Sequence, residues 1–167
     1  MEALVFTDIK TLTFKEEKKP IPNEGEELIK VDAAGICGSD MHAYHGLDER
    51  RLPPLILGHE ISGINQRNNL PVVINPLITC LQCHECLSER EHLCANRSLL
   101  GMTKPIARAG GFAEYVVAPS ENILSLPSNV NLQELALTEP TAVAFHAIKI
   151  AKQVSFKKID EANILII

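Results

Sequence analysis

The most informative stretch of this chain reads Cys80-Leu81-Gln82-Cys83-His84-Glu85-Cys86, and after seven more residues it reaches Cys94. The spacing is C-x2-C-x2-C-x7-C. Four thiolates within fifteen residues can close a tetrahedron around Zn²⁺. Because all four positions of that tetrahedron are filled, we predict a structural zinc. It would tie down a lobe of about residues 78–97, whose folding is then coupled to metal binding.

An iron–sulfur cluster is the main alternative, because compact runs of cysteine also suit that cofactor. Ligand type and spacing favour zinc. Two histidines, His84 and His92, lie inside the lobe, and we expect them to be solvent-facing loop residues rather than ligands.

Composition is that of a globular protein. The chain has 167 residues, of which 46% are apolar and 22% charged, which is enough for one domain with a core. The formal charge is −5, which argues against a nucleic-acid partner. The sequence has neither a signal-peptide segment nor an apolar run of about 18 residues, so no membrane partner is expected. We expect a cytoplasmic protein, in which clustered thiols bind metal before they form disulfides.

The first 127 residues predict short strands separated by Gly and Pro, a pattern typical of a β-barrel or sandwich. A short polar stretch between two of these strands predicts a tight turn at Asn68-Asn69. The candidate strands are residues 3–6, 28–34, 61–64, 71–74, 113–117 and 122–126.

The pattern changes after Pro127. Residues 131–137 predict a helix with Asn131 as its N-cap, and residues 141–152 predict a second helix that starts after Pro140. His146 on the second helix is expected to be a packing residue. Residues 162–167 predict a short buried strand, and a helix followed by a fully apolar strand often begins a doubly wound α/β domain.

The fifth cysteine belongs to a second group of motifs, which lies outside the lobe. One Cys, one His and one carboxylate from separate segments would form a metal site with an open fourth position, as catalytic zinc requires. Spacing alone indicates this weakly, because a lone Cys is more often a small buried hydrophobe. By itself Ser39 indicates a turn residue and His42 a surface histidine. The motifs are Gly35-Ile36-Cys37-Gly38-Ser39-Asp40-Met41-His42, Gly58-His59-Glu60 and Glu139-Pro140.

These motifs, the four-cysteine lobe and Gly110-Gly111-Phe112-Ala113-Glu114-Tyr115 follow one another along the chain. Together they resemble the zinc-dependent medium-chain dehydrogenases, and among these the polyol enzymes such as sorbitol, galactitol-phosphate and threonine dehydrogenases. The resemblance implies a mainly β fold, with a GroES-like, partly open β-barrel and its zinc lobe over residues 1–127. Residues 128–167 would then hold helices and the first strand of an incomplete Rossmann domain.

The resemblance also implies a ligand set for a catalytic zinc. Cys37 and His59 match two ligands, and Glu139 matches the third position. Glu60 would ligate the metal or stand beside it. Asp40 matches a residue that accepts a hydrogen bond from the ligand histidine and so fixes its tautomer.

A proton path is implied in the same way. Ser39 matches the hydroxyl that takes the substrate's proton, and His42 matches the outer end of a relay to solvent. Tyr44 and His45 would follow along the substrate cleft. Gly110-Gly111 precedes a strand rather than a helix, so we expect a turn there rather than a phosphate loop.

The implied reaction is the reversible oxidation of a secondary alcohol or polyol by NAD or NADP, with one catalytic and one structural Zn²⁺. No G-x-G-x-x-G occurs in these residues, so we expect the chain to be inactive alone. The full-length protein is expected to be a homodimer or homotetramer, and residues 164–167 to self-associate or form a disordered tail. The alternatives are a non-catalytic, zinc-stabilised binding or scaffold domain and a thiol switch.

Overall fold

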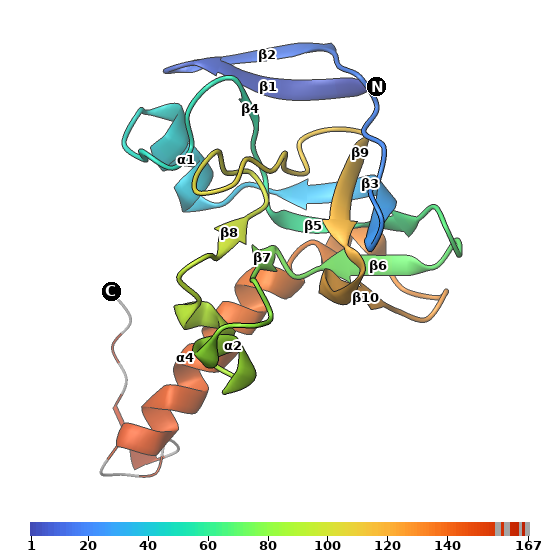
Figure 1. Cartoon of the computed structure of the whole chain (residues 1–167). Helices are drawn as coiled ribbons and strands as arrows, with labels where there is room; N and C mark the ends of the chain where they lie inside the picture. The colour runs from blue at the N-terminus through green and yellow to red at the C-terminus, as the bar shows by residue number, and fades with distance from the viewer. Residues whose placement is uncertain (156–157, 159–160, 164, 166–167) are drawn as a thin grey trace.

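An antiparallel sheet of five strands forms the centre of the structure, a computed structural model that describes residues 1–155, 158, 161–163 and 165 (Figure 1). The longest strand, β3, pairs with β5 on one side and with β9 on the other. In order across the sheet, the strands are β10 (Ile123–Ser125), β6 (Pro71–Ile74), β5 (Glu60–Asn65), β3 (Glu26–Gly35) and β9 (Tyr115–Pro119).

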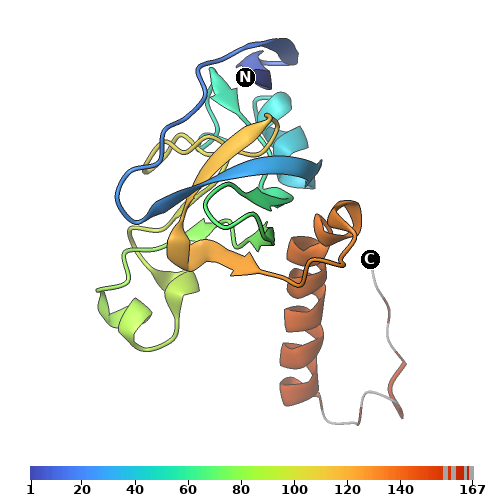
Figure 2. The same cartoon turned by 90° about the vertical axis from the view of Figure 1, so that its right-hand side faces the viewer.

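Apolar side chains from this sheet form the larger core, because alternate residues of each strand point to the same face. The buried members are Ile29, Ile61, Val72, Ile74, Leu100, Val116 and Ala118. The curled sheet agrees with the predicted GroES-like half-barrel (Figure 2). The β5–β6 connection makes the predicted tight turn, and Asn69 takes a φ of +62° there.

A second, three-stranded sheet lies beside the first and carries the smaller core. Its order is β2 (Thr11–Glu16), β1 (Glu2–Asp8) and β4 (Leu55–Ile56). A short helix, α1 (Gly38–Tyr44), packs against it through Ala43, which meets Phe6, Leu55 and Leu57. Neither β2 nor α1 is predicted from the sequence.

The four-cysteine lobe projects from the barrel (Figure 1). A two-stranded ladder of β7 (Leu77–Ile78) and β8 (Ser98–Leu99) closes its base. Between them lie α2 (His84–Leu87) and a 3-10 turn, η1 (Glu91–Leu93), and a second 3-10 turn, η2 (Ser120–Asn122), precedes β10. His84 and His92 are exposed, as predicted.

The helix α3 (Leu132–Leu135) is shorter than predicted but begins where expected. Oδ1 of Asn131 accepts the N–H of Gln133 at 3.0 Å, so Asn131 is the N-cap. The hydroxyl of Ser62 on β5 donates to the carbonyl of Leu132 at 2.5 Å. This bond links α3 to β5 of the central sheet.

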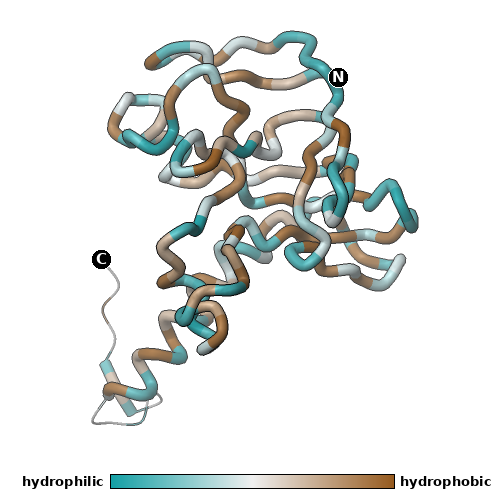
Figure 3. Tube along the Cα trace, viewed as in Figure 1, coloured by the Kyte–Doolittle hydropathy of each residue, from teal (hydrophilic) through white to brown (hydrophobic). Residues whose placement is uncertain are grey.

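The helix α4 (Thr138–Val154) begins three residues before the predicted start at 141, and Pro140 lies in its first turn. Proline is tolerated there because the first-turn N–H has no partner within the helix. The prediction that His146 is a packing residue is wrong, because every residue from 141 to 150 is exposed. Figure 3 shows apolar residues along this exposed helix. Half of the strand expected over 162–167 lies outside the described residues, and the described residues 162, 163 and 165 are not in a strand.

The predicted strands before residue 127 are confirmed as β1, β3, β5, β6, β9 and β10, with shifts of a few residues at their ends. In the part of the chain that the structure describes, no helix is both long and apolar enough to cross a membrane.

Candidate metal centres

The four cysteines of the lobe converge on one point. The Sγ atoms of Cys80, Cys83, Cys86 and Cys94 all lie within 4.8 Å of one another, and three of the separations are 3.4, 3.6 and 3.9 Å. A tetrahedral ion with Zn–S bonds of about 2.3 Å holds its sulfur atoms about 3.8 Å apart. All four are free thiols. The donor set therefore fits a closed, four-sulfur zinc site.

The thiols of the lobe differ in acidity. Backbone N–H groups of Gln82 and Cys83 point at the sulfur of Cys80 and lower the pKa of that thiol to about 6. Burial and the neighbouring sulfur of Cys83 raise the pKa of Cys86 to about 11. Four thiolates this close repel one another, so a cation is needed before all four can ionise.

A second cluster forms at the end of the central sheet. Cys37, His59 and Glu60 each contribute one potential ligand atom, and these three atoms lie within 4.8 Å of one another. Cys37 is the N-cap of α1 and lies just after the end of β3, while His59 and Glu60 stand at the start of β5. Because β3 and β5 are antiparallel with Gly35 opposite Glu60, their register brings the three side chains together.

Two glycines make this approach possible. A Cβ on Gly35 would overlap Oε2 of Glu60, so only glycine leaves room for the carboxylate. Gly58 has a φ of +93°, and a Cβ there would strike the ring of Phe112. Close contacts therefore restrict both the residue opposite Glu60 and the residue before His59 to glycine.

The carboxylate of Asp40 joins the two segments that form this cluster. Its Oδ2 accepts the N–H of Cys37 at 3.0 Å, and its Oδ1 accepts the N–H of Gly58 at 3.2 Å. Nδ1 of His59 lies 3.7 Å from Oδ1, an ion-pair separation beyond hydrogen-bond reach. Since Nδ1 faces Asp40, Nε2 of the ring is left for a metal.

Electrostatics within the cluster favour charged forms. Burial raises the pKa of Asp40, but the His59 ring and the two N–H groups outweigh it and hold the pKa below its ordinary value. Burial lowers the pKa of His59, but Asp40 and Cys37 outweigh it, so the net shift is upward. The hydroxyl and N–H of Ser39 overcome burial and lower the pKa of the Cys37 thiol.

The remaining predicted site residues surround the cluster at different depths. Ser39 and His42 lie one turn apart on α1, with the Ser39 hydroxyl buried and His42 exposed. The hydroxyl of Ser39 is near enough to the Cys37 thiol to lower its pKa, but among the described residues no group meets the hydroxyl oxygen with hydrogen-bond geometry. Glu139 lies in the first turn of α4 and is not part of the cluster within 4.8 Å. Burial and the charge of Glu60 raise its pKa, while His59 opposes the shift.

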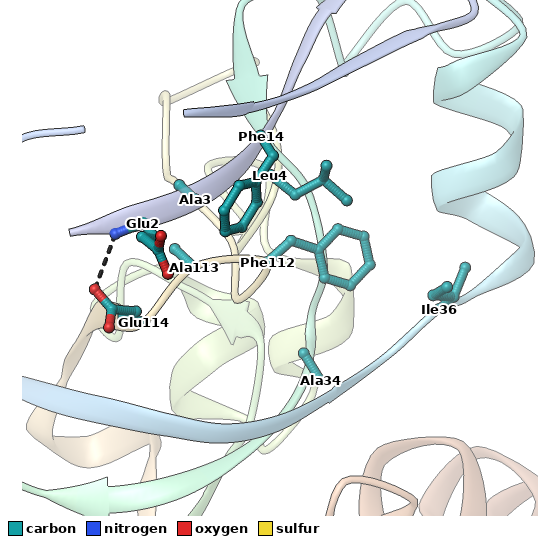
Figure 4. Close-up of a pocket in the computed structure, with 9 residues that line it drawn as sticks. All are labelled: Glu2, Ala3, Leu4, Phe14, Ala34, Ile36, Phe112, Ala113 and Glu114. Atoms are coloured by element: carbon teal, nitrogen blue, oxygen red, sulfur yellow. Dashed lines mark hydrogen bonds between the residues drawn. The ribbon is translucent and has the colours of Figure 1, made fainter. Parts of the chain in front are cut away.

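Two adjoining apolar cavities open beside α1, with volumes of about 350 and 380 Å³. They share Leu4, Ile36 and Phe112, and Figure 4 shows Leu4 and Phe112 near each other with Ile36 apart from them. The second cavity is also lined by Asp40 and Tyr44. The structure thus places Tyr44, but not His45, at a cavity next to the cluster.

The sequence reasoning missed the roles of Gly35, Gly58 and Phe112. All three belong to the sequence motifs above. Their close contacts arise only from the pairing of β3 with β5 and from the approach of residues 110–112 to Gly58. The N–H of Gly111 donates to the carbonyl of Gly58 at 2.9 Å, so this segment supports the His59 backbone.

Comparisons with known proteins show the family of this domain. Residues 23–128 match the family model for the alcohol dehydrogenase GroES-like domain. L-galactonate-5-dehydrogenase of Escherichia coli K12 is 36% identical over 89% of this chain, which spans 45% of that relative's length. The chain therefore spans about half the length of the curated relatives it matches.

Two solved structures have the same fold. An Escherichia coli CFT073 alcohol dehydrogenase complexed with NADH has a TM-score of 0.82 and is 29% identical, covering 91% of this chain and 46% of that one. A cobalt- and zinc-bound alcohol dehydrogenase from Pyrobaculum aerophilum has a TM-score of 0.71 and is 28% identical, covering 81% of this chain and 44% of that one.

Proposed function

Because the chain belongs to the family of alcohol dehydrogenase GroES-like domains, we propose that it is the catalytic-domain part of a zinc-dependent dehydrogenase. The reaction would be the oxidation of a secondary alcohol or polyol with NAD or NADP. The observation that carries this proposal is the convergence of Cys37, His59 and Glu60. Asp40, which accepts the N–H of Cys37, also lines an open cavity.

The donor set of that cluster fits a three-ligand zinc site. A thiolate, an imidazole and a carboxylate leave the fourth position of a tetrahedron open. When bound, zinc would supply Lewis-acid polarisation of the alcohol or carbonyl oxygen. Asp40 would orient the ligands, because it accepts hydrogen bonds from the backbone N–H groups of Cys37 and of Gly58, the residue before His59.

Two carboxylates compete for the third ligand position. Glu60 lies within the cluster, and Glu139 lies close enough that the charges of His59 and Glu60 act on it. Glu60 would hold the metal in the arrangement that the structure shows, and Glu139 is the alternative third ligand. Resemblance to polyol dehydrogenases supports the role of Glu139.

The proton path runs along α1. The buried hydroxyl of Ser39 has no hydrogen-bond partner among the described residues, so it is available to receive a hydrogen bond from a substrate hydroxyl. His42 lies one turn further, on the same side of the helix, with its ring exposed to solvent. An exposed imidazole exchanges protons readily with water, which suits the outer end of a relay.

The lobe is assigned a structural zinc on its four cysteines, and we propose a domain boundary near residue 127. For the whole protein we propose a site for NAD or NADP, a homodimeric or homotetrameric state and a cytoplasmic location. The galactonate named for the Escherichia coli K12 relative supports a polyol-like substrate class for this protein too.

Metal analysis of the purified 167-residue chain tests this function. We expect two zinc ions per chain, and Cys37→Ser should retain only the lobe zinc. Without an added nucleotide-binding part, the chain should not oxidise sorbitol with NAD or NADP. One zinc per chain that is lost on Cys80→Ser, with Cys37→Ser unchanged, would instead support a non-catalytic scaffold domain.

A further inference from the structure

A third cavity, of about 350 Å³, lies at the base of the cysteine lobe. Its walls include three cationic side chains, Arg50, Arg97 and Lys104. Apolar side chains complete it, among them Leu77, Leu99 and Met102. None of its lining residues belongs to either metal cluster, so the proposed metal chemistry does not explain its charge.

The cations are not neutralised by their neighbours. Arg50 pairs with Asp48 at 3.0 and 3.2 Å, but Asp48 also pairs with the buried Arg51, so this trio keeps one positive charge. Nη1 of Arg97 donates to the backbone carbonyl of Cys94 at 3.0 Å, which is a neutral acceptor.

Lys104 is the most available of the three. Across the residues that the structure describes, no hydrogen bond or ion pair is found for its side-chain ammonium, and the residue is exposed. The region therefore has a net charge of about +3, with one charge from the Asp48 trio and one each from Arg97 and Lys104, in a chain whose formal charge is −5. A zinc ion on four thiolates would contribute two negative charges, which still leaves the region positive.

Backbone hydrogen bonds hold together the two segments from which Arg50 and Lys104 extend. The carbonyl of Arg50 accepts the N–H of Thr103 at 2.8 Å and the N–H of Lys104 at 3.2 Å. The hydroxyl of Thr103 donates to the same carbonyl at 2.8 Å. The segments of Arg50 and Lys104 are thus fixed side by side, which lowers the ordering cost of binding an anion between them.

We infer that this cavity binds the phosphate group of a small phosphorylated metabolite. A guanidinium fork and an ammonium both recognise phosphate oxygens, and a phosphate monoester carries about −1.5 to −2 charges at pH 7. The volume is enough for the phosphate and a short carbon body, which would lie against Leu77, Leu99 and Met102. The inference holds whether or not the second metal cluster is catalytic.

Calorimetric titration of the zinc-loaded chain at constant ionic strength tests the inference. The probes are glycerol 3-phosphate and glycerate, which offer a phosphate and a carboxylate on similar carbon bodies, and inorganic phosphate. We expect glycerol 3-phosphate to bind, inorganic phosphate to compete with it, and glycerate to bind at least tenfold more weakly.

Variants decide whether binding occurs at this cavity. Lys104→Gln and Arg97→Gln should each weaken glycerol 3-phosphate binding by roughly tenfold. Lys30→Gln, an exposed lysine on β3, is the matched control and should change nothing. If Arg97→Gln loses the lobe zinc, its weaker binding could come from the unfolded lobe, and the effect of Lys104→Gln on glycerol 3-phosphate binding then tests the inference. Absence of binding, equal effects of Lys104→Gln and Lys30→Gln, or glycerate binding as tightly as the phosphate would each overturn the inference.

Discussion

The backbone N–H of Gly58 donates to Oδ1 of Asp40 at 3.2 Å, and this bond joins the loop before His59 to the helix that follows Cys37. The other oxygen of the same carboxylate accepts the N–H of Cys37. One side chain therefore sets the distance between two segments that lie about twenty residues apart in sequence.

Asp40→Asn should loosen the second metal cluster. An amide has one oxygen, so one of the two N–H groups would meet an NH₂ donor instead of an acceptor. Zinc affinity at this cluster should fall by about 10- to 100-fold, while the lobe zinc stays. Competition with a chromogenic chelator measures both sites. Asp32→Asn, at an exposed position on β3, is the control, and an equal loss in the two variants would contradict the prediction.

Gly35→Ala should displace the carboxylate of Glu60. The new methyl group would overlap Oε2, and the flexible end of the Glu60 side chain is the part that can move. If Glu60 is a ligand, zinc affinity at the cluster should fall by roughly tenfold or more.

Gly38→Ala offers a close control for this variant, since a Cβ on Gly38 meets nothing within 4 Å. It should leave metal binding unchanged and stabilise α1 by up to about 1 kcal/mol. The absorption spectrum of the cobalt-substituted protein reports the ligand set directly. A Gly35→Ala spectrum identical to that of the parent would rule out Glu60 as a ligand.

Cys86→Ser should remove one zinc ion per chain and unfold the lobe without emptying the other cluster. The lobe has little apolar core of its own, so its folding depends on the metal. Zinc content and the thermal unfolding midpoint measure the effect. Cys37→Ser is the complementary variant, which should lose the other zinc and keep the lobe folded. Loss of both ions in Cys86→Ser would mean that the two sites are coupled.

Much of this site is visible in the sequence because ligand identity and spacing are local. The four cysteines of residues 80–94 and the Gly58-His59-Glu60 triplet indicate metal through their residue types and order alone. The helix α1 is not predicted, since Gly38 and Ser39 are weak helix formers and its start depends on the bond from Cys37 to Asp40. The contact of Gly35 with Glu60 depends on strand register, which links residues far apart in sequence.

The error at His146 has a related cause. Helical periodicity tells which residues share a face, but not whether another element covers that face. The apolar positions of α4 recur at helical spacing, and the structure leaves them exposed.

Asp48→Asn should lower the free energy of unfolding at pH 7 by about 1–2 kcal/mol. Burial raises the pKa of Asp48, but hydrogen bonds from Arg50 and Arg51 outweigh it and lower the pKa to about 2. Because this lies below the value in the unfolded chain, the stabilisation is complete above about pH 4 and is lost as the pH falls toward 2.

Urea unfolding at pH 2.5, 4 and 7 checks this dependence. The quantity to compare is the difference between variant and parent at each pH, because loss of metal in acid is common to both. That difference should shrink from pH 7 to pH 2.5. Glu49→Gln changes a neighbouring exposed carboxylate and should show no such trend. A difference that is constant with pH would show that the charge of Asp48 is not responsible.

The exposure of α4 has a consequence for how the chain opens in solution. An isolated helix of its length is marginal in water. Among the described residues, the start of α4 lies near Ile61 of β5 and Leu135 of α3, while residues 141–150 are exposed. Amide hydrogens from about residue 143 onward should therefore exchange with solvent orders of magnitude faster than those of β3, β5 and β6. The chain would then have two opening free energies, a near-zero one along the helix and a much larger one for the sheet that positions Cys37, His59 and Glu60.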